Sequence, residues 1–313
     1  MTSMSIDSYL PQNVPPELQA YFTKSQSKVG KPGKIGILRL KFERDSTSGI
    51  TVIRDQYSHV PLLAQRAIYL EETLPAMAYV YIVSPSGGIL QGDRYKIDIT
   101  MGHNTLAHVT TQGATRIYKM QNNYASQIVN IKVEKDGYFE YIPDQIIPFR
   151  NSRFYQEVHL NVHDTATMIY SEIIVPGRVA SGEAFEYDIC YIKTIGMNHL
   201  GNPRFKDTIN LEPKKNNLRT EGILGNLHVV GTIYIITKES SVNDLHYKIS
   251  NIIIESKSRE KISAGASILP GRQGIMVRIL GKSTEDVKKM IYSIISTARK
   301  NIMNASFSGI RKA

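Results

Sequence analysis

An alternation of apolar and polar residues recurs in the middle of the chain at intervals of roughly thirty residues. It is clearest around Ile97, Val129 and Val158, and each alternating segment is followed by a short turn and a second extended segment. Such a unit buries only one face, so neighbouring units have to stack before a core is complete. The pattern therefore predicts a mainly β fold whose body is solenoid-like or built of stacked β-sheets, although a β-sandwich meander could imitate it.

The 313 residues divide by their pattern into three parts. Residues 34–201 carry the β-rich body. Residues 1–33 are polar and contain several prolines, so we expect a flexible N-terminal tail in which residues 18–22 could dock as a short helix. Residues 202–313 are expected to form an α+β portion that packs on the body, so that the whole chain is one continuous structural unit.

The α+β portion opens with a polar, basic stretch, residues 205–221, which we expect to be a long excursion or a ligand-contacting loop. A strand over residues 229–236 is followed by a predicted helix that Ser241 or Asn243 caps. Two more strands and a final helix capped by Ser283 complete the order strand–helix–strand–strand–helix. Both helices are amphipathic and should cover one face of a sheet. The apolar stripe of the last helix consists of Val287, Met290, Ile291, Ile294, Ile295, Ala298 and Ile302.

Metal-binding and redox-active residues are sparse. Cys190 is the only cysteine, which excludes an intrachain disulfide and favours a small apolar filler of the core. Histidines and cysteines do not occur at the spacing of a zinc site, so no stable metal site is expected. The pairs His159 with His163 and His103 with His108 are expected to face outward, where solvated polar side chains are commoner than metal ligands.

The chain shows neither the apolar core of a signal peptide nor an apolar run long enough to cross a bilayer. We therefore expect a cytoplasmic protein that has no membrane partner.

The formal net charge of +10 favours acidic partners. The basic residues are spread along the chain and do not cluster among aromatic residues, so a solvated basic surface is expected rather than a nucleic-acid interface. Two alternatives remain open from the residues alone. One is a β-solenoid enzyme that acts on an acidic polysaccharide, and the other is a basic nucleic-acid-binding protein. The lack of tryptophan disfavours the sugar-binding enzyme.

The most unusual segment is the glycine-rich stretch of residues 85–93. Gly87, Gly88 and Gly92 permit positive φ and a close approach of the backbone to its neighbours. The lysine of a phosphate-binding loop is missing, so nucleotide binding is not predicted. The segment is either a tight structural turn or a shaped loop at a tunnel mouth or partner surface, with Asp93 exposed to a passing cation.

Two roles are open for Arg178. A buried arginine needs a carboxylate partner, which Glu183 or Glu172 could supply, and the result would be a structural ion pair. Alternatively, Asp93, Glu172 and Glu183 line a polar internal path, and Arg178 belongs to the tunnel lining. Carboxylates would let a cation pass, whereas a closed multi-histidine site would retain the ion.

Four groups of short motifs together resemble the urease accessory protein family UreD, also called UreH. They occur in the family's order and with similar spacing over about residues 78–187. The motifs are SPSGG at 84–88 with GDR at 92–94, TTQGAT at 110–115 with IYK at 117–119, FEYIPD at 139–144 with IIPF at 146–149, and SEII at 171–174 with PGR at 176–178 and GEAF at 182–185.

This resemblance implies a non-catalytic scaffold for urease maturation. Members bind apo-urease subunits and the accessory protein UreF, and through UreF they recruit the GTPase UreG, which carries nickel. The resemblance implies no tightly bound cofactor, with nickel only in transit through an internal tunnel. By position, Asp93 matches the acidic residue of the family's glycine-rich motif, and Glu172 and Glu183 match its later acidic positions.

Overall fold

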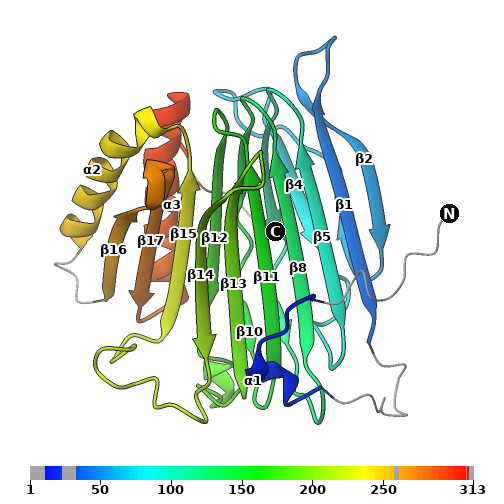
Figure 1. Ribbon diagram of the computed structural model, residues 1–313, viewed down its shortest axis with the longest axis vertical. Helices are drawn as coiled ribbons and strands as arrows, with labels where there is room; N and C mark the ends of the chain where they lie inside the picture. Colours follow the sequence, from blue (N-terminus) through cyan, green and yellow to red (C-terminus); the bar gives the residue numbers. More distant parts are fainter. Residues whose placement is uncertain (1–10, 23–32, 257–260, 308, 310–313) are drawn as a thin grey trace.

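The computed structural model describes residues 11–22, 33–256, 261–307 and 309, and within them two β-sheets of seven and ten strands face each other (Figure 1). The seven-stranded sheet has the order β14 (Pro203–Leu211), β13 (Ile189–Asn198), β11 (Arg153–Val162), β8 (Ala125–Val133), β5 (Arg94–Met101), β1 (Ile35–Arg44) and β2 (Thr51–His59).

The ten-stranded sheet has the order β16 (Ile262–Ile268), β17 (Gly274–Gly281), β15 (Val229–Ile236), β12 (Thr167–Ile174), β9 (Tyr138–Tyr141), β6 (Leu106–Thr111), β4 (Ala78–Val83) and β3 (Leu63–Ala64). Two short strands lie off this path, and β10 (Ile146–Pro148) pairs with both β12 and β7 (Thr115–Ile117). Because β15 pairs with β12, the strands of the C-terminal part extend the same sheet as the body.

The chain winds as a coil, because from β4 to β13 it passes repeatedly from one sheet to the other; the short strands β7 and β10 stay in the ten-stranded sheet with β6 and β9. Equivalent residues of successive coils lie side by side in parallel register: Ile97 pairs with Val129, and Val129 pairs with Val158. All three side chains are buried between the sheets. The prediction of a mainly β, solenoid-like body is therefore confirmed, and its repeat is the one visible in the sequence.

Two helices, α2 (Glu239–Ser256) and α3 (Thr284–Met303), pack on the outer face of the ten-stranded sheet at its C-terminal end (Figure 1). The predicted order of strands and helices is confirmed, and the Ser283 hydroxyl caps α3 by accepting from the Asp286 N–H. The predicted cap of the other helix was wrong. That helix begins at Glu239, so Ser241 and Asn243 lie inside its first turns. None of the helices described here is both long and apolar enough to cross a membrane.

Part of the expected loop over residues 205–221 is a strand, and the prediction was wrong there. Residues 203–211 form β14, which pairs with β13 at the edge of the seven-stranded sheet. Phe205, Ile209 and Leu211 are buried, whereas Lys206, Thr208 and Asn210 between them are exposed. Because one face of this edge strand is exposed to solvent, about half of its residues are polar, and its composition resembles that of a loop.

Within the interval expected to be a tail, residues 11–22 carry the one-turn helix α1 (Pro16–Gln19). Leu18 is fully buried against Tyr124, Tyr155 and Ile189 on the outer face of the seven-stranded sheet. Residues 1–10 and 23–32, which belong to the same expected tail, lie outside the described residues.

A buried ion-pair network fastens α3 to the sheet. The Arg299 side chain is 0% exposed, and its guanidinium donates to both oxygens of Glu140 at 2.6 and 2.7 Å and to both oxygens of Glu71 at 2.7 and 2.9 Å. The Nδ1 atom of His108 lies 2.6 Å from Glu140. Burial alone would raise the pKa of Glu140, but the hydrogen bonds from Arg299 and His108 outweigh it and lower that pKa to about 2.

We expect Arg299→Met to lower the free energy of unfolding by about 3–5 kcal/mol, because it leaves the buried Glu140 carboxylate without its main partner. Denaturant titration of the folded chain measures this value. Lys289→Met, on the exposed side of the same helix, is the matched control and should change stability little. Equal stability of the two variants would contradict the structural role of Arg299.

Candidate functional site

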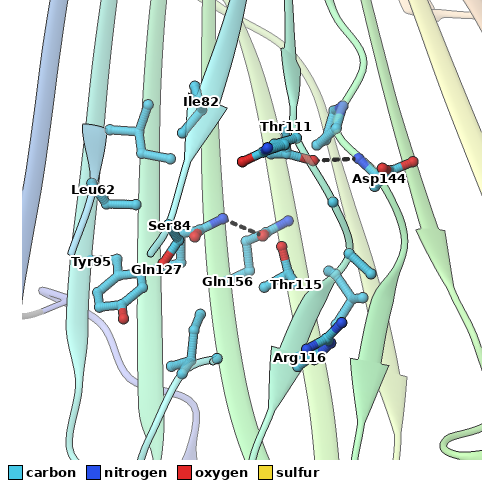
Figure 2. Close-up of a pocket in the computed structure, with 18 of the residues that line it drawn as sticks. Leu62, Ile82, Ser84, Tyr95, Thr111, Thr115, Arg116, Gln127, Asp144 and Gln156 are labelled. Carbon is cyan, nitrogen blue, oxygen red and sulfur yellow. Dashed lines mark hydrogen bonds between the residues drawn. The ribbon is translucent and has the colours of Figure 1, made fainter. Parts of the chain in front are cut away.

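A polar cavity of about 240 Å³ lies between the two sheets, beside the loops that carry the glycine-rich motif (Figure 2). Ser84 and residues 86–88 and 111–116 line it from these loops, and several of them are exposed to solvent. Side chains from β5, β8, β11 and β12 line its interior part. The cavity therefore joins the surface at the loops to the space between the sheets.

The glycines of the first loop allow it to close against the second. A Cβ atom on Gly88 would lie 2.5 Å from the backbone oxygen of Arg116 and equally close to the Tyr118 ring, and one on Gly87 would lie 2.9 Å from the Tyr118 hydroxyl. Ile89 and the second loop exchange backbone hydrogen bonds, with Ile89 N–H donating to Arg116 at 2.8 Å. Gly92 has φ +79°, which side-chain-bearing residues rarely adopt.

The Asp93 side chain holds this loop in place by binding backbone N–H groups. Its carboxylate accepts the N–H groups of Lys34 and Leu90, both at 2.9 Å, and its side chain is buried. Burial raises the pKa of Asp93 in spite of these hydrogen bonds. The carboxylate is outside the cavity lining, but the Tyr95 hydroxyl lies 3.4 Å from it and Tyr95 does line the cavity.

Glu172 is the carboxyl group that lines the interior part of the cavity, and it is only 3% exposed. One of its oxygens accepts a hydrogen bond from the Tyr170 hydroxyl at 2.8 Å. Among the described residues, no donor reaches the other oxygen. Burial raises the pKa of Glu172 to about 7, more than the hydrogen bond from Tyr170 and the charge of Arg278 lower it. The cavity thus contains a carboxyl group with a free acceptor.

A line of amides and hydroxyls leads to Glu172. The Gln127 side chain donates to that of Gln156 at 3.0 Å, and Gln156 donates to the Tyr170 hydroxyl at 3.2 Å. Figure 2 shows Gln127 and Gln156 side by side on neighbouring strands. Tyr95, Gln127 and Gln156 are register partners on β5, β8 and β11, so they form one polar row across the seven-stranded sheet.

Sequence reasoning missed Tyr95, Gln127, Gln156 and Tyr170, although a signal was present. Tyr95, Gln127 and Gln156 each occupy an inward position of an alternating strand whose other inward residues are apolar, and Tyr170 lies on β12, which is buried on both faces. A polar residue at such a position has to meet another polar group inside the protein. Their convergence on one cavity depends on the register between coils, which the sequence alone does not determine.

Glu183 lies outside the cavity lining and pairs with Arg178. The Arg178 guanidinium donates to both Glu183 oxygens at 2.6 and 2.9 Å, and this hydrogen bonding lowers the pKa of Glu183. Arg178 is exposed at its surface and also packs on the Phe149 ring. Phe149 contacts Tyr118, the residue that packs on the glycine-rich loop. The pair therefore holds a loop that supports the cavity's entrance.

The histidines occupy different environments. The expectation that His108 faces outward was wrong: it is buried and bonded to Glu140, because its strand is covered on that face by α3. His103 is exposed, His159 lies 3.4 Å from Glu157, and the His163 ring packs on that of His199. Within the described residues, no group of three or more histidine, cysteine or acidic side chains is placed to hold a metal ion.

Cys190 is fully buried on β13, and burial raises the pKa of its thiol. It fills the core between the sheets as a small apolar side chain.

Known proteins resemble this chain over nearly its whole length. A family model described as UreD urease accessory protein matches residues 34–311. A protein named urease accessory protein UreD from Cenarchaeum symbiosum (strain A) is 44% identical over 287 residues, which cover 92% of this chain and 99% of the relative. Another of that name, from Photorhabdus laumondii subsp. laumondii, is 37% identical over 285 residues, with 90% and 87% covered. The urease accessory protein UreD 2 of Brucella canis is 38% identical over 283 residues, with 90% and 92% covered.

The raised pKa of Glu172 predicts a pH-dependent stability. Between pH 4.5 and about 7 the folded protein holds a proton that the unfolded chain has released, so this group lowers the free energy of unfolding as pH rises. Glu172→Gln is neutral throughout. The difference in the free energy of unfolding, original chain minus variant, should therefore fall by roughly 3 kcal/mol as the pH rises across this window.

Denaturant titrations at several pH values measure this difference, and Glu221→Gln on the exposed surface is the control. A pH-independent difference for Glu172→Gln would show that the carboxyl group is not buried as described.

Proposed function

The chain belongs to the UreD family of urease accessory proteins, and on this premise we propose that it is a non-catalytic scaffold through which nickel passes toward the urease active site. In this proposal it binds apo-urease subunits and UreF, and it meets the GTPase UreG through UreF. It works in the cytoplasm, holds no tightly bound cofactor, and needs neither a membrane nor nucleic acid as a partner.

The observation that carries the metal route is the buried Glu172 carboxyl group with its free oxygen in the cavity between the sheets. Carboxylate oxygens coordinate divalent cations, and the amides and hydroxyls leading to Glu172 add neutral oxygen ligands. Asp144, the other carboxylate in the lining, is paired with Lys288 at 2.6 Å. A single buried carboxylate among neutral donors binds an ion weakly. That donor set suits an ion in transit better than one in storage.

The other two carboxylates have supporting roles in the proposal. Asp93 fixes the glycine-rich loop through the N–H groups of Lys34 and Leu90. Glu183 holds Arg178 against Phe149 behind the second loop. Both keep the entrance in shape, and Glu172 is the carboxylate that the ion would meet.

We expect Glu172→Gln to leave the protein complex with urease intact and to lower the nickel content and activity of the urease it helps to mature, by several-fold. The substitution keeps the size of the side chain and removes the charge that attracts the cation. Co-expression with urease and the other accessory proteins, followed by metal analysis and an activity assay, measures the effect.

Glu221→Gln is again the matched control, because it makes the same substitution on the exposed surface. Deleting the whole chain should give urease that is complete in protein and poor in nickel. Normal nickel content after deletion would refute the role in maturation, whereas normal nickel content with Glu172→Gln alone would refute only this route.

A further inference from the structure

In the described part of the chain, the main strand orders of the two sheets end at four strands: β14, β2, β3 and β16. Natural proteins protect such edges with charges, prolines or very short strands, because the unpaired backbone can bind another strand. Three edges follow this rule. Strand β14 contains Pro203, Lys206 and Asp207, β2 contains Arg54 and Asp55, and β3 has 2 residues.

Strand β16 breaks the rule. Its 7 residues, ISAGASI, include no charged residue and no proline. Ser263, Gly265 and Ser267 on one face are exposed, and small side chains leave room for close approach of another backbone. A long, uncharged edge of this kind is a template for strand pairing.

The register shows which backbone groups of β16 are free. Leu269 N–H donates to Gly274 and Lys282 N–H donates to Lys261, so the odd-numbered residues exchange hydrogen bonds with β17. In an antiparallel pair the residues between them point their N–H and C=O groups the other way. The even-numbered residues 262–268 therefore present these groups at the edge. The C=O of Ala266 confirms the direction, since His246 of α2 lies 3.3 Å from it.

Helix α2 lies beside β16 (Figure 1) and carries two exposed apolar side chains. Tyr247 and Ile254 are two helical turns apart and are 66% and 63% exposed. Asn243, one turn before Tyr247, bonds to Arg272 at the end of β16, whereas Asp244 faces α3 through Asn301. The flank with Tyr247 and Ile254 is therefore turned away from α3 and toward the open edge.

We propose that the edge of β16 and this flank of α2 bind an extended, uncharged strand of a partner protein, flanked on both sides by acidic residues. The partner's backbone would pair with the N–H and C=O groups of the even-numbered residues, except the Ala266 C=O that His246 already contacts. Its apolar side chains would pack on Tyr247 and Ile254. Exposed Lys261 and Lys282 lie at one end of the strand and exposed Arg272 at the other, which selects acidic flanks. This surface is separate from the cavity and does not depend on a metal route.

The same charges disfavour a second copy of the chain as the occupant. A two-fold antiparallel pairing about Gly265 would set Ile262 of one copy against Ile268 of the other. The Lys261 end would then lie next to the Arg272 end of the other copy, cation against cation.

A synthetic peptide tests the proposal on the full chain. The probe is fluorescein-labelled, alternates valine and threonine over the length of β16, and carries a pair of glutamates at each end. We expect saturable binding by fluorescence anisotropy, and at least about tenfold weaker binding of a peptide with lysines in place of the glutamates. Absence of saturable binding, or equal binding of the two peptides, would overturn the proposal.

Ala264→Pro tests the edge itself, because proline removes an N–H that points away from β17 and leaves the β16–β17 ladder intact. It should weaken peptide binding by about tenfold or more, whereas Ala264→Ser keeps the N–H and should bind as the original chain does. If Ala264→Pro does not fold, a peptide methylated at alternate backbone nitrogens replaces it and should fail to bind the original chain. Undiminished binding in either experiment, or a self-association that Ala264→Pro abolishes, would contradict a foreign strand at this edge.

Discussion

Each coil of the body buries one row of side chains between two sheets, and this constraint shapes everything inside the protein. An apolar residue at an inward position extends the core, as Ile97, Val129 and Val158 do. A polar residue at such a position has no partner except another inward residue or the space between the sheets. Because the coils stack in register, Gln127 and Gln156 fall in one row and face Tyr170. The cavity is thus a consequence of stacking.

The loops and the helices fix this body at two places. At the cavity's entrance, Gly88 lets two loops pack at a distance that any Cβ atom would prevent, and Asp93 holds the first loop by its backbone. On the outer face, Arg299 joins α3 to the sheet through Glu140 and Glu71. Removing water from these charges is costly, and complete pairing offsets that cost. Both fastenings use charged groups that take no part in the proposed metal route.

Periodicity predicted the parts of the fold in which one face is strictly apolar. The stacked coils and the apolar stripe of α3 are such parts. The cap at Ser283 was predicted from the residue type at the start of that stripe. Prediction failed where an element is half solvated or where tertiary packing decides. Lys206 and its neighbours gave β14 the composition of a loop, and His108 lies under a helix nearly two hundred residues later in the chain. For the site, motifs identified the loops and Glu172, but only the register between coils shows that Gln127, Gln156 and Glu172 share a cavity.

We propose that the interior of this UreD family member admits a nickel ion as far as Glu172. Diffraction from crystals soaked in nickel, recorded on both sides of the nickel absorption edge, tests it directly because anomalous differences locate the metal. If nickel enters the cavity, an anomalous nickel peak is expected between the sheets, beside the free oxygen of Glu172. Nickel found only on surface groups such as His159 or His163, with nothing between the sheets, would contradict it.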